Sequence, residues 1–197
     1  GVGGPSGVGK STLAKSIIGL YPQKDRGIYW NGVAYDEFDR NSFREVCSLI
    51  QPAGFLRVGT LRQSLALGAK SGVADSVILE CLSRFELGDW FRKQSLGLDS
   101  PTESSIIKTS GGESQLLGLV QALLATPALL VIDEALNALD PQTHHRILTQ
   151  VREHRKGLLT LLITHRQEAF SECDQVILLR KATSDLDSIH SVVARTG

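Results

Sequence analysis

Several residue types that mark specialised proteins are scarce or absent in this 197-residue chain. It has no methionine, only three cysteines and an aromatic content of 6%. At this length the chain is not a short disulfide-stapled fold. Because Cys47, Cys81 and Cys173 are far apart and lack C-x-x-C spacing, the sequence argues against a zinc site and predicts buried apolar thiols. The longest apolar runs, such as 129–132 and 161–163, fall far short of the roughly 18 residues that suggest a membrane span.

Neither sign of charge is in excess, because 21 basic residues balance 21 acidic ones. The global charge therefore attracts neither nucleic acid nor an anionic membrane, and we predict no nucleic-acid partner. The hydrophobic content of 42% is that of an ordinary globular domain. Since the chain begins Gly-Val-Gly-Gly without an initiator methionine or a signal peptide, we interpret it as part of a longer protein.

Apolar runs alternate with amphipathic patterns near both ends of the chain, which is typical of a parallel sheet covered by helices. We predict strands at 48–51, 129–132, 158–164 and 176–179, helices at 13–19, 39–47, 141–155 and after 167, and a hairpin at 27–35. Between them, three further helical patterns occur at 60–67, 75–85 and 114–124. The predicted architecture is an α/β core of residues 1–51 and 125–182, an inserted helical subdomain at 52–124 and a polar tail at 183–197.

Residues 4–11 match the phosphate-loop pattern G-x-x-x-x-G-K-[ST] and run directly into a predicted helix. The glycines let backbone N–H groups surround phosphate oxygens, while Lys10 would bind the β- and γ-phosphates and Ser11 would bind Mg²⁺. The full match disfavours the alternative, a glycine-rich turn that only starts a helix. The strand that should lead into this loop is represented only by residues 1–3, so we expect part of the sheet to lie outside this chain. The predicted nucleotide contacts come from Gly4, Pro5, Ser6, Gly7, Val8, Gly9, Lys10, Ser11 and Thr12.

Asp133 and Glu134 directly follow the apolar run at 129–132. Ligands of open α/β sheets bind at the carboxyl ends of the strands, where these two carboxylates would lie. Asp133 would hold the Mg²⁺ shell, and Glu134 would orient or deprotonate an attacking water. By itself, a strand end capped by solvated acids is an equally good interpretation, but the upstream phosphate loop favours the catalytic one.

A second glycine-rich segment, Ser110-Gly111-Gly112, precedes the helical pattern at 114–124. Its N–H groups would form another anion-binding helix N-terminus. Because one chain seldom needs two such devices for one nucleotide, we interpret this one as serving a nucleotide held by another subunit. A simple helix cap followed by a flexible loop is the alternative.

Other polar residues at strand ends are weaker candidates. Gln51 and His165 each follow an apolar strand and would reach the same sheet edge as Asp133, so we expect both to sense the γ-phosphate. The remaining histidines lack metal-ligand spacing and are interpreted as surface residues: His144, His145, His154 and His190. The basic stretch 152–156 is interpreted as a solvated helix end that complements the helix dipole.

The order of these motifs resembles the nucleotide-binding domain of ATP-binding cassette (ABC) proteins over essentially the whole chain. The resemblance implies a P-loop NTPase, RecA-like parallel-sheet core and ATP with Mg²⁺ as ligands. It makes Gln51 the Q-loop glutamine and a Mg²⁺ ligand beside Ser11 and Asp133, and His165 the switch histidine. Residues 110–113 would be the signature motif and 137–140 the D-loop, so Ser110, Gly111, Gly112 and Asp140 are expected to contact nucleotide.

Finer resemblance points to the exporter-like branch of this family. Gly54-Phe55 with Gly59-Thr60-Leu61, and the acidic Glu103, are similar to segments of exporters. The signature departs from the family pattern, because Thr109 stands where Leu is usual and Glu113 where Gln is usual. Such changes are expected to weaken closure on a partner's ATP without abolishing it.

Three functional hypotheses follow from the resemblance. The first is an ATP-hydrolysing motor of an exporter-type transporter, which works as a head-to-tail dimer at the cytoplasmic face of a membrane and drives an attached transmembrane domain. The second is a soluble ATPase of DNA maintenance, which would need a coiled coil that residues 52–109 do not encode. The third is a catalytically weak regulatory domain in an asymmetric pair, which the atypical signature keeps open although Glu134 and His165 are both present.

Overall fold

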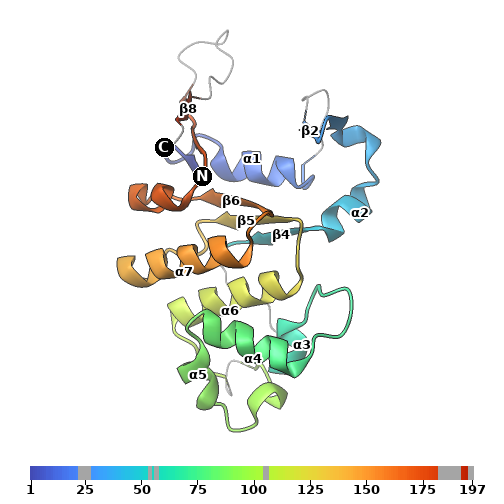
Figure 1. The fold of residues 1–197 in the computed structure, drawn as a ribbon, viewed down its shortest axis with the longest axis vertical. Helices are drawn as coiled ribbons and strands as arrows, with labels where there is room; N and C mark the ends of the chain where they lie inside the picture. Colours follow the sequence, from blue (N-terminus) through green and yellow to red (C-terminus); the bar gives the residue numbers. More distant parts are fainter. Residues whose placement is uncertain (22–27, 53–54, 56–57, 104–106, 182–191, 195–197) are drawn as a thin grey trace.

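The computed structural model describes residues 1–21, 28–52, 55, 58–103, 107–181 and 192–194 (Figure 1). Gly54 of the exporter-like segment, His190 and most of the predicted tail lie outside the described residues. The described strands form a six-stranded sheet in the order β4-β5-β6-β1-β7-β8 and a separate hairpin β2-β3. Their bounds are β1 Val2–Gly3, β2 Tyr29–Trp30, β3 Val33–Ala34, β4 Cys47–Ile50, β5 Leu129–Asp133, β6 Leu159–Ile163, β7 Val176–Leu178 and β8 Val192–Ala194.

All pairings in the large sheet are parallel except that of β7 with β8. Ile50 of β4 lies opposite Ile132, and Asp133 lies opposite Ile163, so the carboxyl ends of β4, β5 and β6 share one edge. The predicted parallel α/β core is therefore confirmed, and its strands deliver their following residues to a common edge.

Helices cover both faces of the sheet, which explains why β5 is apolar at every position before Asp133. Leu129 and Val131 pack in a cluster with Ala14 of α1 and with Ile18, which directly follows this helix. Leu130 and Ile132 belong to the larger cluster that includes residues of α6 and α7. Figure 1 shows α1 on one side of the sheet and α6 and α7 on the other. The helices are α1 Lys10–Ile17, α2 Arg40–Glu45, α3 Leu61–Leu65, α4 Asp75–Arg84, α5 Gly88–Arg92, α6 Gly111–Leu124 and α7 Pro141–His154, with 3₁₀ turns η1 Tyr35–Glu37, η2 Gly97–Asp99 and η3 Gln167–Glu172.

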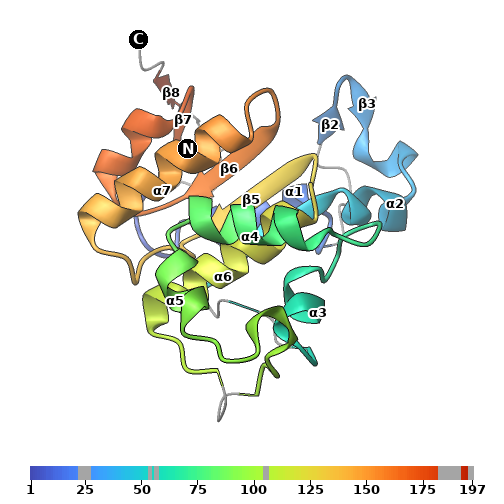
Figure 2. The same ribbon diagram turned by 60° about the horizontal axis from the view of Figure 1, so that its bottom comes forward.

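The inserted segment forms the expected helical subdomain, in which α3, α4 and α5 gather around α6 (Figures 1 and 2). Leu61, Ile78, Phe85 and Leu117 are fully buried in the same cluster as the residues of β5. Because this apolar interior is continuous, α6 is shared between the subdomain and the sheet. Truncating a buried side chain such as Phe85 to alanine costs about 3–5 kcal/mol in such an interior. Sequence reasoning missed α5 and η2.

The hairpin turns where the sequence predicts. Asn31 has φ 48° and Gly32 φ 81°, and both values suit a two-residue hairpin turn that matches the strand twist. Part of the C-terminal tail departs from the prediction, because β8 pairs antiparallel with β7, Val193 opposite Ile177. In the described part of the chain, no helix is both long and apolar enough to cross a bilayer.

The interpretation of residues 152–156 as a solvated helix end is wrong for Arg155, which is only 4% exposed. Its guanidinium donates hydrogen bonds to the carbonyls of Pro127, Ala128 and Leu159 and to the hydroxyl of Thr160, at 2.8–3.4 Å. These acceptors lie at or before the amino ends of β5 and β6. Burial lowers the pKa of Arg155, and the fixed donors of the guanidinium satisfy carbonyls at these strand ends.

The prediction of buried apolar thiols holds for one cysteine only. Cys81 is buried in the helical subdomain, where desolvation raises its pKa to about 12. Cys47 and Cys173 are only partly buried. Desolvation also raises the pKa of Cys47, to about 11. Neither the Cys81 nor the Cys47 thiol is therefore poised as a nucleophile.

Candidate functional site

The loop between β1 and α1 is shaped by glycines with positive φ, at 139° for Gly4, 74° for Gly7 and 101° for Gly9. A Cβ on Gly4 would lie 2.5 Å from the backbone oxygen of Leu179, whereas one at Gly7 or Gly9 would meet nothing within 4 Å. The loop therefore packs tightly at its base and leaves its backbone open at its tip. An open backbone at the start of a helix is what a phosphate group requires.

Lys10 starts α1 and turns back into this loop. Although it is only 5% exposed, its ammonium donates hydrogen bonds to the carbonyls of Gly4 at 3.0 Å and Pro5 at 3.1 Å. An ammonium has three N–H donors, so one remains for a further acceptor. The positive charge is thus held where the predicted phosphates would lie.

The next residue of α1 joins the loop to the end of β5, because the Ser11 hydroxyl donates to Asp133 Oδ1 at 2.8 Å. A hydroxyl and a carboxylate are hard oxygen ligands of the kind that Mg²⁺ prefers. Among the described residues, no group of three or more His, Cys, Asp or Glu side chains could hold a metal by itself. The residues present therefore fit Mg²⁺ that is bound partly through phosphate and water oxygens.

Glu134 and His165 form the second part of the sheet-edge site. The carboxylate Oε1 of Glu134 lies 2.6 Å from Nε2 of His165, and the two side chains are 28% and 45% exposed. Glu134 has φ 54°, a left-handed conformation that non-glycine residues seldom adopt, and its N–H donates to the carbonyl of Ile163. Such an outlier at a sheet edge is typical of a functional site that the surrounding fold holds in place.

Gln51 directly follows β4 and is exposed at the same edge. Because Ile50 is in register with Ile132, Gln51 is placed beside Asp133 across the two strands. It also lines a cavity of about 710 Å³ between β4, α2, α6 and residues 67–70. Gln51 thus lies between the predicted catalytic edge and this groove.

The second predicted anion site forms the N-terminus of α6. The Ser110 hydroxyl accepts from the N–H of Glu113 at 3.2 Å, and the Glu113 carboxylate accepts from the N–H of Ser110 at 2.7 Å. This reciprocal capping box leaves the first-turn N–H groups of Gly111 and Gly112 without an intrahelical partner. No hydrogen bond between described residues joins this N-terminus to the phosphate loop at 4–12.

Instead, the α6 N-terminus packs against the segment 137–140 that lies beyond the end of β5. A Cβ on Gly112 would lie 3.1 Å from Leu139 Cδ2, so a larger residue here would force that side chain to shift by a few tenths of an ångström. Gln115 Oε1 accepts from the N–H of Ala138 at 2.9 Å. Asp140 caps α7 by accepting from the N–H groups of Gln142 and Thr143, and these bonds, that of Thr143 first, lower its pKa.

The sequence model of the ABC transporter family matches residues 1–137 of this chain. The chain belongs to this family.

Its relatives include exporter-type members of the family. The chain is 31% identical over 176 residues to the "Uncharacterized ABC transporter ATP-binding protein YwjA" of Bacillus subtilis, covering 89% of this chain and 30% of that protein. It is 32% identical over 178 residues to "ABC transporter ATM1" of Toxoplasma gondii, covering 90% of this chain and 16% of that protein. A bacterial Atm1-family ABC exporter with ATP bound superposes with a TM-score of 0.81 at 26% identity, over 91% of this chain and 31% of that one.

The chain thus spans about a third or less of the length of each of these proteins. The resemblance to an exporter-like ABC nucleotide-binding domain is confirmed, and so is the P-loop NTPase fold with its helical insertion. The chain is therefore an ABC transporter ATP-binding domain of the exporter type. Members of the ABC transporter family are generally ATPases.

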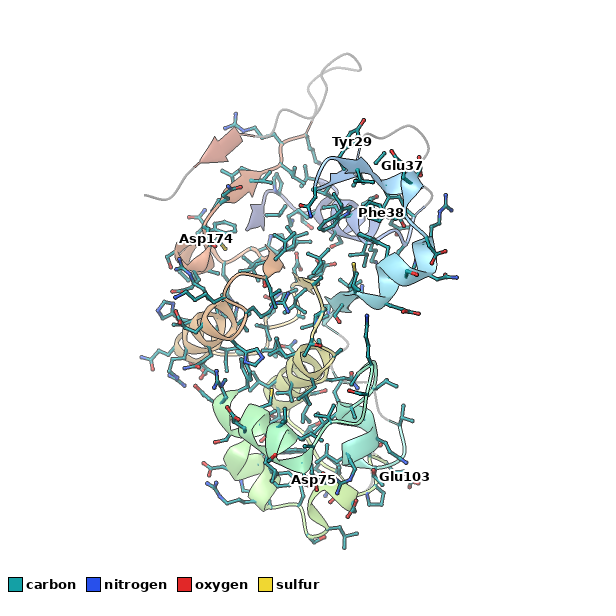
Figure 3. All side chains as sticks on the ribbon, turned by 45° about the vertical axis from the view of Figure 1, so that its right-hand side comes forward. Tyr29, Glu37, Phe38, Asp75, Glu103 and Asp174 are labelled. Carbon is teal, nitrogen blue, oxygen red and sulfur yellow. The ribbon has the colours of Figure 1, made fainter. Side chains whose placement is uncertain are left out.

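The two segments that resemble exporters lie side by side in this ABC domain. Thr60 pairs with Pro101, and the N–H of Thr102 donates to the carbonyl of Gly59 at 2.8 Å. Glu103 follows directly and lies at the end of the helical subdomain farthest from Tyr29 of the hairpin (Figure 3). Their joint placement was not predicted from the sequence.

Two residues of the site escaped sequence reasoning. Neither Gln115 nor Arg166 was assigned a role from the sequence. Arg166 follows His165, and its Nη2 donates to the carbonyls of Asn137 at 3.0 Å and Leu139 at 2.7 Å. The one available signal was the position of an arginine directly after a strand-end histidine.

The interpretation of His144 as a surface residue is wrong, because it is only 2% exposed. It lies in the first turn of α7, and burial is the main cause that lowers its pKa. The positive charges of Arg166 and His145 act in the same direction, while Glu168 opposes them. His145 is exposed as predicted and pairs with Glu172 at 3.3 Å.

Proposed function

We propose that this chain binds ATP with Mg²⁺ and hydrolyses it as the motor domain of an exporter-type ABC transporter. The observation that carries the proposal is the convergence of three elements at one sheet edge: the loop around Lys10, the Ser11–Asp133 hydrogen bond and the Glu134–His165 pair. Phosphate binding, metal binding and activation of water thereby fall within one small region.

The triphosphate would lie along the open backbone of residues 4–9, whose inward N–H groups and helix dipole favour negative charge. The free N–H donor of Lys10 would bind the β- and γ-phosphates, and Ser6 and Thr12 flank the loop as exposed hydroxyl donors. Ser11, Asp133 and Gln51 would hold Mg²⁺, which neutralises charge on the phosphate oxygens when it is bound.

Glu134 would accept a proton from the attacking water as the water oxygen bonds to the γ-phosphorus and the bond to the ADP oxygen breaks. His165 holds one carboxylate oxygen of Glu134 at 2.6 Å, which leaves the other oxygen to face the water. The left-handed backbone conformation of Glu134 fixes the direction in which its side chain leaves the main chain. The role of the pair is positioning and proton transfer, which suits phosphoryl transfer to water.

The α6 N-terminus would act on a second nucleotide. Its Gly111 and Gly112 N–H groups pack beside residues 137–140 and make no hydrogen bond to the chain's own phosphate loop among the described residues. A head-to-tail dimer would bring Ser110, Gly111, Gly112 and Asp140 of one chain to the phosphate loop of its partner. Two ATP molecules would then lie at the dimer interface.

Coupling to transport requires a membrane-spanning part, and in the described ranges of this chain no helix could cross a bilayer. We propose that a transmembrane domain, fused or associated, receives the motion and places the chain at the cytoplasmic face of a membrane. The groove of about 710 Å³ beside Gln51 is the surface that supports this coupling, because Gln51 belongs both to the groove and to the catalytic edge.

The test is steady-state ATP hydrolysis by the full-length protein that carries this chain. Glu134→Gln is expected to abolish Mg²⁺-dependent turnover while ATP still binds, and Lys10→Ala is expected to reduce both. Matched controls are Glu153→Gln, at an exposed position of α7, and Lys15→Ala, in the last turn of α1. Wild-type turnover no faster than that of Glu134→Gln would refute the motor hypothesis.

A regulatory half-site is the second candidate, favoured by Glu113. Its carboxylate lies on the N-terminus of α6, where a partner's phosphate would have to bind. A negative charge at that point repels an anion, so this chain would complete its partner's site poorly while keeping a sound site of its own. Mixing with a partner chain of the usual signature, and measuring turnover at each site, distinguishes the two candidates.

A further inference from the structure

Residues 137–140 are held by two side chains from opposite sides. On one side, Gln115 of α6 accepts the N–H of Ala138 through Oε1. On the other, Arg166 donates from one amino group to the carbonyls of Asn137 and Leu139. Two peptide groups, 137–138 and 139–140, are thus fixed by side chains that are distant in sequence.

The two holding residues belong to the two halves of the proposed machinery. Gln115 is only 7% exposed and lies on the helix whose N-terminus would meet the partner's phosphate. Arg166 directly follows His165, which holds Glu134, and its N–H donates to Thr164 Oγ1 at 3.0 Å. A shift of either α6 or the segment after β6 must therefore move residues 137–139 or break a hydrogen bond.

The hydrogen bonds of Arg166 and Gln115 can be tested by substitutions that keep or remove the donor or acceptor. A single amino group, Nη2, makes both hydrogen bonds, while Nη1 is buried and has no hydrogen-bond partner among the described residues. A lysine ammonium carries enough donors to replace Nη2, whereas leucine carries none. For Gln115, glutamate keeps the acceptor and leucine removes it.

We propose that Gln115 and Arg166 are positioning residues that tie the α6 N-terminus to the Glu134–His165 pair through residues 137–139. This inference rests on the proposed ATP hydrolysis by a dimer. When a partner's nucleotide binds the N–H groups of Gly111 and Gly112, α6 shifts. This shift is transmitted through Gln115 to Ala138, and from there through Arg166 to His165. Closure at one site thereby aligns the water-activating pair of the other.

The first experiment measures exchange of the Ala138 amide hydrogen in the full-length protein, which needs no turnover. Gln115→Leu removes its acceptor, so faster exchange is expected there. Arg166→Leu leaves that acceptor in place, and faster exchange of Ala138 in this variant is the result that demonstrates the link. Unchanged exchange in Arg166→Leu overturns the proposal.

The second experiment measures ATP turnover in the same variants. Both leucine variants are expected to lower kcat by about 10- to 100-fold with little change in KM, because misalignment affects the reacting geometry more than nucleotide binding. Gln115→Glu and Arg166→Lys are expected to recover part of kcat. The double leucine variant should lose little more than either single one, because both act on the same segment.

Matched controls separate positioning from packing. Gln121→Leu changes the same residue type on the same helix at similar burial, where the amide donates to Ser64 O instead. Arg152→Leu removes an arginine of α7 that pairs with Asp174. Equally fast exchange of the Ala138 amide in Gln115→Leu and Gln121→Leu, or losses of turnover confined to KM, overturn the proposal. If the wild type fails to exceed Glu134→Gln, the proposed function fails, and the exchange data alone then decide whether the link exists.

Discussion

The two glycine-rich helix N-termini of this molecule, those of α1 and α6, differ in how far the chain satisfies them itself. Helix α1 follows Gly9 in a left-handed conformation, without a side-chain cap and without an acidic residue in its first turn. Helix α6 follows Ser110, whose hydroxyl and the Glu113 carboxylate close a capping box. The first N-terminus is thus open to an anion, whereas the second is half satisfied.

The difference teaches which of the two N-termini can bind phosphate alone. The α1 loop combines an open backbone at Gly7 and Gly9 with the buried ammonium of Lys10, so it has both the space and the charge that a phosphate needs. The α6 N-terminus offers the N–H groups of Gly111 and Gly112 but carries a carboxylate of its own. It suits a phosphate that another subunit already holds, because it adds contacts to a ligand that it would bind weakly by itself.

The largest expected effect comes from removing the charge at the α1 N-terminus. Lys10→Ala should weaken ATP affinity by about 100-fold, because charge-assisted hydrogen bonds to phosphate are lost in a buried setting. Fluorescent-nucleotide titration measures the affinity, and Lys15→Ala on the same helix should leave it within about twofold. Equal losses in both variants would mean that α1 matters only as a scaffold.

A smaller effect is expected at the α6 N-terminus. Ser110→Ala removes the helix cap, at a cost of about 1 kcal/mol, and should lower turnover by about 10-fold in the dimer. ATP affinity of the isolated chain should not change, because Ser110 makes no hydrogen bond to the chain's own phosphate loop among the described residues. Ser114→Ala, one turn further along, is the control, and a loss of affinity in Ser110→Ala would contradict the assignment.

Glu113→Gln sharpens the comparison by making the second N-terminus more like the first. The amide oxygen can still accept the N–H of Ser110, so the capping box is kept while the negative charge is removed. Because such charges at helix ends are worth about 0.3–1 kcal/mol, turnover of the dimer should rise by about 2- to 5-fold. Glu103→Gln controls for net charge, and reduced turnover in Glu113→Gln would show that the carboxylate is needed.

The smallest effect concerns the third N-terminus, that of α7, which Asp140 caps and whose first turn contains the buried His144. The pKa of buried His144 lies below 6.5 in the folded chain, so the unfolded chain binds its proton more readily. His144 therefore contributes stability that is present above pH 6.5 and lost as the pH falls toward its folded pKa, by at most about 1.4 kcal/mol per pH unit.

His144→Gln should flatten this part of the stability profile, as measured by denaturant unfolding between pH 7.5 and 5.5. The pKa of His154 is also lowered, mainly by burial, so His154→Gln is the matched comparison. An unchanged slope in His144→Gln would assign the acid sensitivity elsewhere.

Local patterns predicted most of the fold because they rest on interactions between near neighbours. The phosphate loop fixes a turn and a helix start within nine residues, and the apolar strand 129–133 must be buried on both faces. The Asn31-Gly32 turn is equally local. Sequence order also placed Gln51, Asp133 and His165 at one edge, because parallel strands deliver their ends together.

Long-range contacts account for what the sequence did not reveal. Arg155 resembles any basic residue at a helix end, and only the carbonyls of Pro127 and Leu159, brought together by the sheet, make its burial favourable. His144 is buried because η3 packs against α7, which no periodicity within α7 encodes. The pairing of β8 with β7 likewise depends on a neighbour far along the chain.

The sequence by itself therefore determined the family, the glycine-rich loop before α1 and the residues that end the strands, since each depends on a short motif or on the alternation of strands and helices. Only the tertiary structure decided that Gln115 and Arg166 hold residues 137–139 and that Glu134 meets His165. The hydrogen bonds of Gln115 and Arg166 join residues 23–29 positions apart, and Glu134 and His165 follow separate strands. These residues come within hydrogen-bond distance only because the sheet and α6 fold around one core.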